Sequence, residues 1–254
     1  MKMHIEDNKR VGILGSYIDC LTMDETISRI DEVIKKREPV QHVVLNAAKI
    51  NLLKKDEQLR TIINQCDIIN ADGSSIVLAG RLLGIDIPER VTGIDLFGNL
   101  IELADRKGYR VYYFGAEEEV VSKVVRIHQE RYKNLNIVGY RNGFFSDEES
   151  ETIANKINMA KPDILFVAFS SPKKEYWIHQ FKDNLSVPFV MGVGGSFDVL
   201  AGKTKRAPLW MQHYGLEWFY RFIQEPRRMF RRYIIGNVVF LRHIWSEKWK
   251  IIRS

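Results

Sequence analysis

The stretch Cys66–Gly84 reads CDIINADGSSIVLAGRLLG and decides the fold class of this 254-residue chain. The apolar pair Ile68–Ile69 is typical of a short buried strand, and an Asp72-Gly73 pair follows it. Residues 74–83 then have the pattern of a helix. A strand that runs through a glycine turn into a helix is the unit of open α/β sheets, in which ligands bind at the carboxyl ends of the strands.

The same alternation continues on both sides of this stretch. Short apolar runs predict buried strands, and helical patterns follow them, the first opened by a Thr22-x-x-Glu25 capping box. The apolar runs lie at residues 11–14, 40–46, 110–114, 136–140, 163–169 and 188–193. Strands that alternate with helices in this way predict an α/β fold with a Rossmann-like, mainly parallel sheet and helices on both faces.

The alternation stops at Gly202, so we predict an α/β catalytic domain over residues 1–202 and a helical appendage over residues 203–254. Helical patterns cover residues 208–224 and the chain from Pro226 onward. The appendage carries twelve Lys or Arg and three Glu, a net charge of +9. Because the whole chain carries +6, the first 202 residues carry −3. A basic appendage that also holds four of the five tryptophans indicates an anionic surface as its partner.

A helical wheel divides the last helix into two sides. Its arginines fall within a sector of about 100°: Arg228, Arg231, Arg232 and Arg242. Apolar residues occupy the other side: Met229, Phe230, Tyr233, Phe240 and Ile244. This pattern is typical of a helix that lies in a membrane interface, and equally of one that packs its apolar side on the protein body. Nucleic-acid binding is disfavoured because no recognition module accompanies the charge.

Several classes of protein are disfavoured by what the chain contains. Hydrophobic residues make up 45% and charged residues 28%, as in globular proteins, and two cysteines favour a reducing compartment. The polar start, residues 1–10, does not resemble a secretory signal. We find no G-x-G-x-x-G after the first strand, no P-loop, no paired histidines and no Asp-x-Asp. We therefore expect neither a bound metal nor a cofactor, and a nucleotide-binding oxidoreductase of the Rossmann type is only weakly supported.

Polar residues follow several of the predicted strands. Asp72 is either the N-cap of the next helix or a general base. Asn46 and Asp95 are expected near it, and the neighbouring loops supply Arg90 and Lys173. Those cations suit a phosphate group, although solvated surface charge is the plainer interpretation. A carboxylate base with cations indicates transfer of a group from a phosphate leaving group to a hydroxyl.

Six motifs in order resemble the WecG/TagA/CpsF family of bacterial glycosyltransferases over roughly residues 11–240. They are Asn70–Gly73, Pro88–Asp95, Ser171–Glu175, Gly192–Asp198, Lys205–Pro208, and Leu216–Arg221 together with Glu225–Arg228. The resemblance implies an inverting transferase without a bound metal. It implies transfer of a sugar from a UDP-sugar to a polyprenyl-diphosphate-linked saccharide, at the cytoplasmic face of the membrane, in the synthesis of a surface polysaccharide.

The resemblance also implies roles for single residues. Asp72 takes the place of the proposed base, and Asn46 and Arg90 take the places of pocket residues. Residues expected to contact substrate are Asp95, Lys173, Lys174 and Arg206, and those expected to meet lipid and diphosphate are Arg221, Arg228 and Arg231. The partners expected are the donor, the acceptor and the membrane surface, without nucleic acid. Self-association and a non-catalytic membrane adaptor remain as alternatives.

Two residues depart from the family pattern. Lys174 stands where the family usually has glutamine, and Val44 stands where a threonine is common. A lysine donates hydrogen bonds and carries a charge, but it accepts no hydrogen bond. We therefore predict a donor with a carboxylate that pairs with Lys174, or an unmodified hexose, rather than N-acetylmannosamine.

Overall fold

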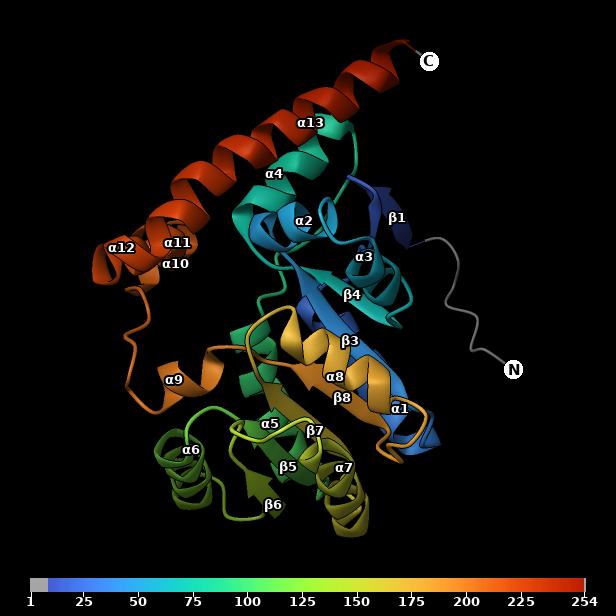
Figure 1. Cartoon of the computed structure of the whole chain (residues 1–254), viewed down its shortest axis with the longest axis vertical. Helices are drawn as coiled ribbons and strands as arrows, with labels where there is room; N and C mark the ends of the chain where they lie inside the picture. The colour runs from blue at the N-terminus through green and yellow to red at the C-terminus, as the bar shows by residue number, and fades with distance from the viewer. Residues whose placement is uncertain (1–8, 254) are drawn as a thin grey trace.

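A six-stranded, all-parallel sheet forms the centre of the computed structural model, which describes residues 9–253 (Figure 1). Its strands are β3 (Val40–Leu45), β4 (Ile68–Ala71), β5 (Arg110–Gly115), β6 (Asn136–Arg141), β7 (Ile164–Ala168) and β8 (Phe189–Gly192). Their order across the sheet is β4-β3-β8-β7-β5-β6. A hairpin of β1 (Arg10–Ile13) and β2 (Ser16–Asp19) covers the edge at β4, where Asp19 accepts a hydrogen bond from the Ile69 amide. The predicted α/β fold is confirmed.

Helices cover both faces of the sheet. One face carries α1 (Met23–Lys36), α5 (Gly93–Lys107), α6 (Glu118–Arg131) and α9 (Ser196–Leu200). The other carries α2 (Ala47–Leu53), α3 (Glu57–Asn64), α4 (Ser74–Leu83), α7 (Glu149–Ala160) and α8 (Lys173–Phe181). Neighbouring strand residues alternate between the two cores, because successive side chains in a strand point to opposite faces. Tyr113 packs under α5 and α6, whereas Phe114 packs under α7 and α8.

For the start of the appendage, the sequence pattern predicted one continuous helix over residues 208–224. The structure has two helices instead, α10 (Leu209–His213) and α11 (Glu217–Gln224). Gly215 lies between them with a φ of +70°, a conformation that favours glycine. In this turn the Gly215 carbonyl accepts a hydrogen bond from the Ser74 hydroxyl at 3.3 Å. A Cβ atom at Gly215 would lie only 2.6 Å from the Ser74 Oγ atom. The break in the helix therefore fits the appendage against the start of α4.

The rest of the appendage is α12 (Pro226–Met229), a π-helical turn (Phe230–Ile235) and α13 (Gly236–Arg253). α13 packs across α2 and α4, where Phe240 is 2% exposed. Met229 and Ile244, from the apolar side of the wheel, are also buried, whereas Phe230 from the same side is 52% exposed. The apolar side is therefore only partly used for packing on the body. A domain boundary after residue 202 stays a prediction.

Two further observations bear on the appendage. The side chains of Arg228, Arg231 and Arg232 lie outside the part of the chain that can be described, so the predicted roles of Arg228 and Arg231 have no structural account here. Between residues 9 and 253, no helix combines the length and the apolar character that crossing a membrane requires.

Replacing Phe240 by alanine should lower the free energy of unfolding by about 3–5 kcal/mol, because the substitution leaves a cavity between α13 and the body. Chemical denaturation followed by circular dichroism measures this loss. Trp245 on the same helix is 62% exposed, so Trp245→Ala is the matched control and should cost less than about 1 kcal/mol. Equal, small effects of both substitutions would contradict the packing of α13 on the body.

Candidate active site

Asp72 lies at the carboxyl end of β4, beside Asn46 at the end of β3. The Asp72 amide donates a hydrogen bond to the Leu45 carbonyl at 2.7 Å, and the Asn46 side chain hydrogen-bonds the Asp72 carboxyl group. Asn46 also caps α2 by accepting from the Lys49 amide at 3.0 Å. Asp72 caps nothing: the N-cap of α4 is Gly73, without a side-chain cap. The capping interpretation of Asp72 was therefore wrong.

The surroundings of Asp72 raise the pKa of its carboxyl group. Burial is the main cause, and the negative charge of Glu217 acts in the same direction. The hydrogen bond from Asn46 and the positive charges of Arg90 and Lys49 lower the pKa, but they do not outweigh the burial. A carboxylate with a raised pKa accepts a proton more readily than an exposed aspartate does. Asp72 is therefore suited to act as a general base.

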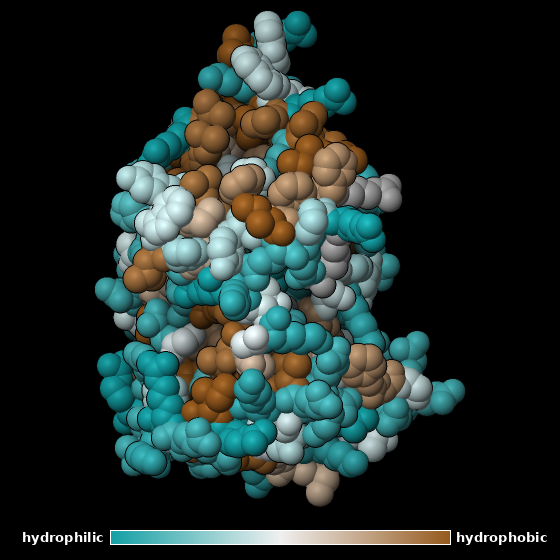
Figure 2. Space-filling model, turned by 90° about the vertical axis from the view of Figure 1, so that its left-hand side faces the viewer, coloured by the Kyte–Doolittle hydropathy of each residue, from teal (hydrophilic) through white to brown (hydrophobic). Residues whose placement is uncertain are grey.

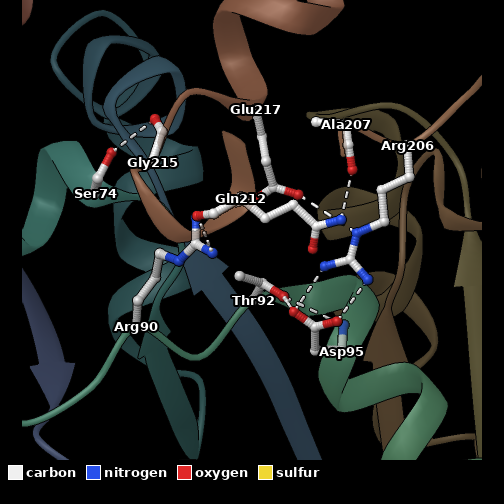
Figure 3. Close-up of polar contacts among 9 residues, drawn as sticks. All are labelled: Ser74, Arg90, Thr92, Asp95, Arg206, Ala207, Gln212, Gly215 and Glu217. Atoms are coloured by element: carbon white, nitrogen blue, oxygen red, sulfur yellow. Dashed lines mark hydrogen bonds and ion pairs between the residues drawn. The ribbon is translucent and has the colours of Figure 1, made fainter. Parts of the chain in front are cut away.

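Four charged residues form a continuous chain of ion pairs (Figure 3), and two of them, Glu217 and Arg90, act on the Asp72 carboxyl group. Glu217 on α11 lies between two guanidinium groups, with Arg90 Nη1 at 3.0 Å and Arg206 Nε at 3.4 Å. Arg206 also makes two contacts to Asp95 on α5, at 2.7 and 2.8 Å. All four side chains are partly buried. The chain of ion pairs therefore fastens the appendage to the body next to Asp72.

Asp95 and Arg206, both predicted to contact substrate, are thus paired with each other. Burial alone would raise the pKa of Asp95, but hydrogen bonds from Arg206 and Thr92 lower it below the usual value. Arg90 has a further contact in the appendage, because its Nη2 donates to the Gln212 carbonyl at 3.3 Å. A hollow of about 590 Å³ lies beside Arg90 and is lined by Trp210 and Tyr214. Contact of these groups with substrate stays a prediction.

A second hollow, of about 630 Å³, lies at the carboxyl ends of β5 and β7. Its lining includes Phe144, Phe169, Ser170, Lys173, Asp198 and Lys203. The Lys173 ammonium lies 4.4 Å from the centre of the Phe145 ring, and Phe144 projects with most of its surface exposed. Cations and aromatic rings at this edge of a parallel sheet are suited to a nucleotide.

Arg221 on α11 lies against the loop that follows β8. A Cβ atom at Gly195 would come within 3.0 Å of its Nη2 atom. The Arg221 Nε atom is buried and has no hydrogen-bond partner within the described residues. An unsatisfied guanidinium N–H is costly to bury, so this arginine is suited to receive an anionic oxygen.

Lys174, which was predicted to contact substrate, is largely buried, and its contact with substrate stays a prediction. Its side chain is only 9% exposed, and its Nζ contacts Glu175 Oε1 at 2.7 Å and the Ser171 hydroxyl at 2.5 Å. Lys49 contacts the same carboxylate oxygen at 2.8 Å. Burial alone would raise the pKa of Glu175, but the two lysines lower it to about 2. Glu175 therefore stays ionised and is shared by the two lysines, and the burial of Lys174 leaves little of its side chain to contact a donor carboxylate.

Sequence reasoning missed two residues that the site depends on, Lys49 and Glu217. Glu217 lies within the Leu216–Arg221 motif, which was the only signal for it. Lys49 follows Asn46 by three residues, and nothing in the sequence pairs it with Glu175, which is 126 positions away. Within residues 9–253, no three His, Cys, Asp or Glu side chains are grouped closely enough to hold a metal ion.

Comparisons with known proteins show the family of the chain. The model of the "Glycosyl transferase WecG/TagA/CpsF family" matches residues 11–254. A protein of Bacillus subtilis is 34% identical over 215 residues, which cover 85% of this chain and 80% of the relative. A Staphylococcus aureus protein is 32% identical over 247 residues, 96% of each chain. Both relatives are named N-acetylglucosaminyldiphosphoundecaprenol N-acetyl-beta-D-mannosaminyltransferase. The predicted family resemblance is confirmed.

Replacing Glu217 by glutamine should lower the pKa of the Asp72 carboxyl group, because it removes a negative charge and leaves Arg90 unneutralised. Titration of the side-chain carboxyl groups by ¹³C NMR measures this shift directly. Glu130→Gln, on the exposed surface of α6, is the matched control and should leave the titration unchanged. An unchanged or raised pKa in the Glu217 variant would contradict the electrostatic link between Glu217 and Asp72.

Proposed function

Because the chain belongs to the WecG/TagA/CpsF family of glycosyltransferases, we propose that it transfers a sugar from a UDP-sugar to a saccharide on a polyprenyl diphosphate. The observation that carries the proposal is the position of Asp72. Its carboxyl group is uncommitted to capping, is held by Asn46 and lies within the electrostatic influence of Arg90, Lys49 and Glu217 at the carboxyl edge of the sheet. The match to glycosyltransferases favours this function over an oxidoreductase or a non-catalytic adaptor.

In the proposed reaction Asp72 is the general base. The acceptor hydroxyl oxygen attacks the anomeric carbon of the donor, and the hydroxyl proton passes to the Asp72 carboxylate. The bond between the anomeric carbon and the diphosphate oxygen breaks with its electron pair, and UDP leaves from the opposite face. The anomeric configuration is therefore inverted. The raised pKa of Asp72 supports this role, because it strengthens the base without removing the contact to Asn46.

We assign the nucleotide of the donor to the hollow between β5 and β7. The exposed ring of Phe144 offers a stacking surface for a base, and Lys173 supplies positive charge at its rim, whereas Lys203 is paired with Glu117 at 2.7 Å. Arg221 supports a diphosphate site between this hollow and Asp72, because its unpaired Nε is available to a phosphate oxygen. Arginine and lysine would then stabilise the negative charge that develops on the leaving group.

The relatives point to the sugars. Their names describe transfer of N-acetylmannosamine to an N-acetylglucosaminyl-diphospho-undecaprenol. Lys174 is buried and already paired with Glu175, which weakens the reason for expecting a uronic acid. We therefore propose UDP-N-acetylmannosamine as the donor and an N-acetylglucosamine on a polyprenyl diphosphate as the acceptor.

A lipid-linked acceptor requires the protein to work at a membrane surface, and α13 supports this. Apolar residues three or four positions apart form one exposed stripe: Val238, Leu241, Trp245, Trp249 and Ile252. Phe240 and Ile244, on the opposite side of the helix, pack into the body. The helix thus has one apolar side for the protein and another that remains uncovered, with tryptophans typical of a membrane interface. We propose peripheral binding to the cytoplasmic face of the membrane.

Replacing Asp72 by asparagine should lower the turnover number about a hundredfold to ten-thousandfold, because asparagine cannot accept the hydroxyl proton. The measurement is acceptor-dependent release of UDP with a short-chain polyprenyl-diphosphate N-acetylglucosamine, in EDTA. The donors compared are UDP-N-acetylmannosamine, UDP-N-acetylglucosamine, UDP-glucose and UDP-glucuronic acid.

The matched control is Asp86→Asn, which changes an exposed aspartate in the loop before Arg90 and should leave turnover unchanged. A loss smaller than about tenfold for Asp72→Asn would contradict its role as the base. A preference for UDP-glucuronic acid would overturn the proposed donor and leave the transferase reaction standing.

Replacing Trp245 and Trp249 together by serine should weaken binding to vesicles that contain phosphatidylglycerol by about tenfold or more, because both rings lose their contact with the bilayer. Co-sedimentation with vesicles measures the affinity. Deleting residues 203–254 is a poorer test, because it also uncovers the core that Phe240 and Ile244 fill. Unchanged binding of the double variant would contradict membrane docking through α13.

A further inference from the structure

The catalytic body has an uncovered apolar surface of its own, on α4. Leu78 and Leu82 lie one helical turn apart and are 50% and 40% exposed. The buried residues of the same helix, Ile76 and Ala79, face the core that α4 shares with α2. In a helix that is packed on one side, two adjacent exposed leucines are unusual and indicate a contact surface.

This surface belongs to the same region as the stripe of α13. α4 packs directly against α13, and Figure 1 places the two helices side by side at one end of the molecule. Figure 2 shows apolar residues gathered over that end, whereas the rest of the visible face is mainly hydrophilic. The two helices therefore present one apolar region, of which α13 supplies only a part.

The charges around this region distinguish between two occupants. The charged residues on α4 and α13 are five cations, Arg81, Arg242, Lys248, Lys250 and Arg253, against the single anion Glu247. A second copy of the chain placed on this region by a two-fold axis would bring these cations toward one another, which costs energy. A bilayer with anionic lipids brings the opposite charge to the same cations.

We propose that the outer face of α4 lies on the same anionic lipid bilayer as α13, so that the catalytic body docks together with its appendage. The inference rests on the membrane docking proposed above. It has a consequence for the site: Leu78 lies one helical turn, about 6 Å, beyond Ser74, which follows Asp72 by two residues. Docking through α4 therefore holds the Asp72 edge of the sheet beside the lipid headgroups, where the diphosphate of a polyprenyl acceptor lies.

The test replaces Leu78 and Leu82 together by serine in the full chain. Binding to vesicles of phosphatidylcholine and phosphatidylglycerol should weaken about tenfold, because two apolar side chains no longer enter the interface. The matched control is Met159→Ser, an exposed apolar residue on α7, which Figure 1 places at the other end of the molecule and which should not alter binding. Thermal unfolding checks the fold of each variant, and Leu82→Gln alone gives the same comparison if the double variant does not fold.

A change of less than about twofold in vesicle affinity, with the fold intact, would overturn the proposal. The proposal would also be overturned if the unsubstituted protein sediments as a dimer and the leucine variant as a monomer. The two leucines would then contact a second copy of the chain. Vesicle binding is measured without substrate, so the result does not depend on the transferase reaction. If vesicle binding weakens for the Trp245 and Trp249 variant but not for the leucine variant, α4 does not contact the bilayer. The appendage alone would then dock on it.

Discussion

The ion pairs from Arg90 through Glu217 and Arg206 to Asp95 are the constraint on which the site depends. Glu217 and Arg206 belong to the appendage, and Arg90 and Asp95 belong to the body, so the chain of charges crosses between the two parts twice. Each of these charges is partly buried and would be costly without its partner. The position of the appendage over the sheet edge is therefore coupled to the environment of Asp72, whose pKa responds to both Glu217 and Arg90.

Charges at the carboxyl edge of the sheet have two different tasks. Lys49 and Lys174 share the single carboxylate of Glu175 inside the protein, where the three groups join α2 to the start of α8. Lys173 and Arg221 are placed differently: the lysine lines a hollow, and the arginine keeps an unsatisfied N–H. Two neighbouring lysines in the sequence thus have unrelated roles, because one side chain is buried on Glu175 and the other lies over aromatic rings at the surface.

α13 has apolar residues on two sides, one packed on the body and one exposed, which explains why its sequence supported two interpretations. Phe240 and Ile244 satisfy the interpretation in which the helix packs on the body. Trp245 and Trp249 are exposed, as the interpretation of a helix in a membrane interface requires. The apolar side of the wheel is thus divided between buried residues such as Phe240 and exposed ones such as Phe230. A helical wheel shows which residues share a side, but not how much of that side the body covers.

The alternation of strands and helices through the central sheet and the position of Asp72 after β4 were determined by the sequence itself, whereas β2 and the break between α10 and α11 were not. These features depend on local patterns, namely apolar runs, caps and glycine turns. They do not depend on the order in which the strands lie in the sheet. The partners of the charges were decided only by the tertiary structure. Lys174 is next to Glu175 in the chain, yet their ion pair also depends on Gly192, because a Cβ atom there would lie 2.7 Å from Lys174 Cε. The ion pair between Glu217 and Arg90 joins residues 127 positions apart. Electrostatic energy depends on distance and burial in space, and neither can be read from the spacing of residues along the chain.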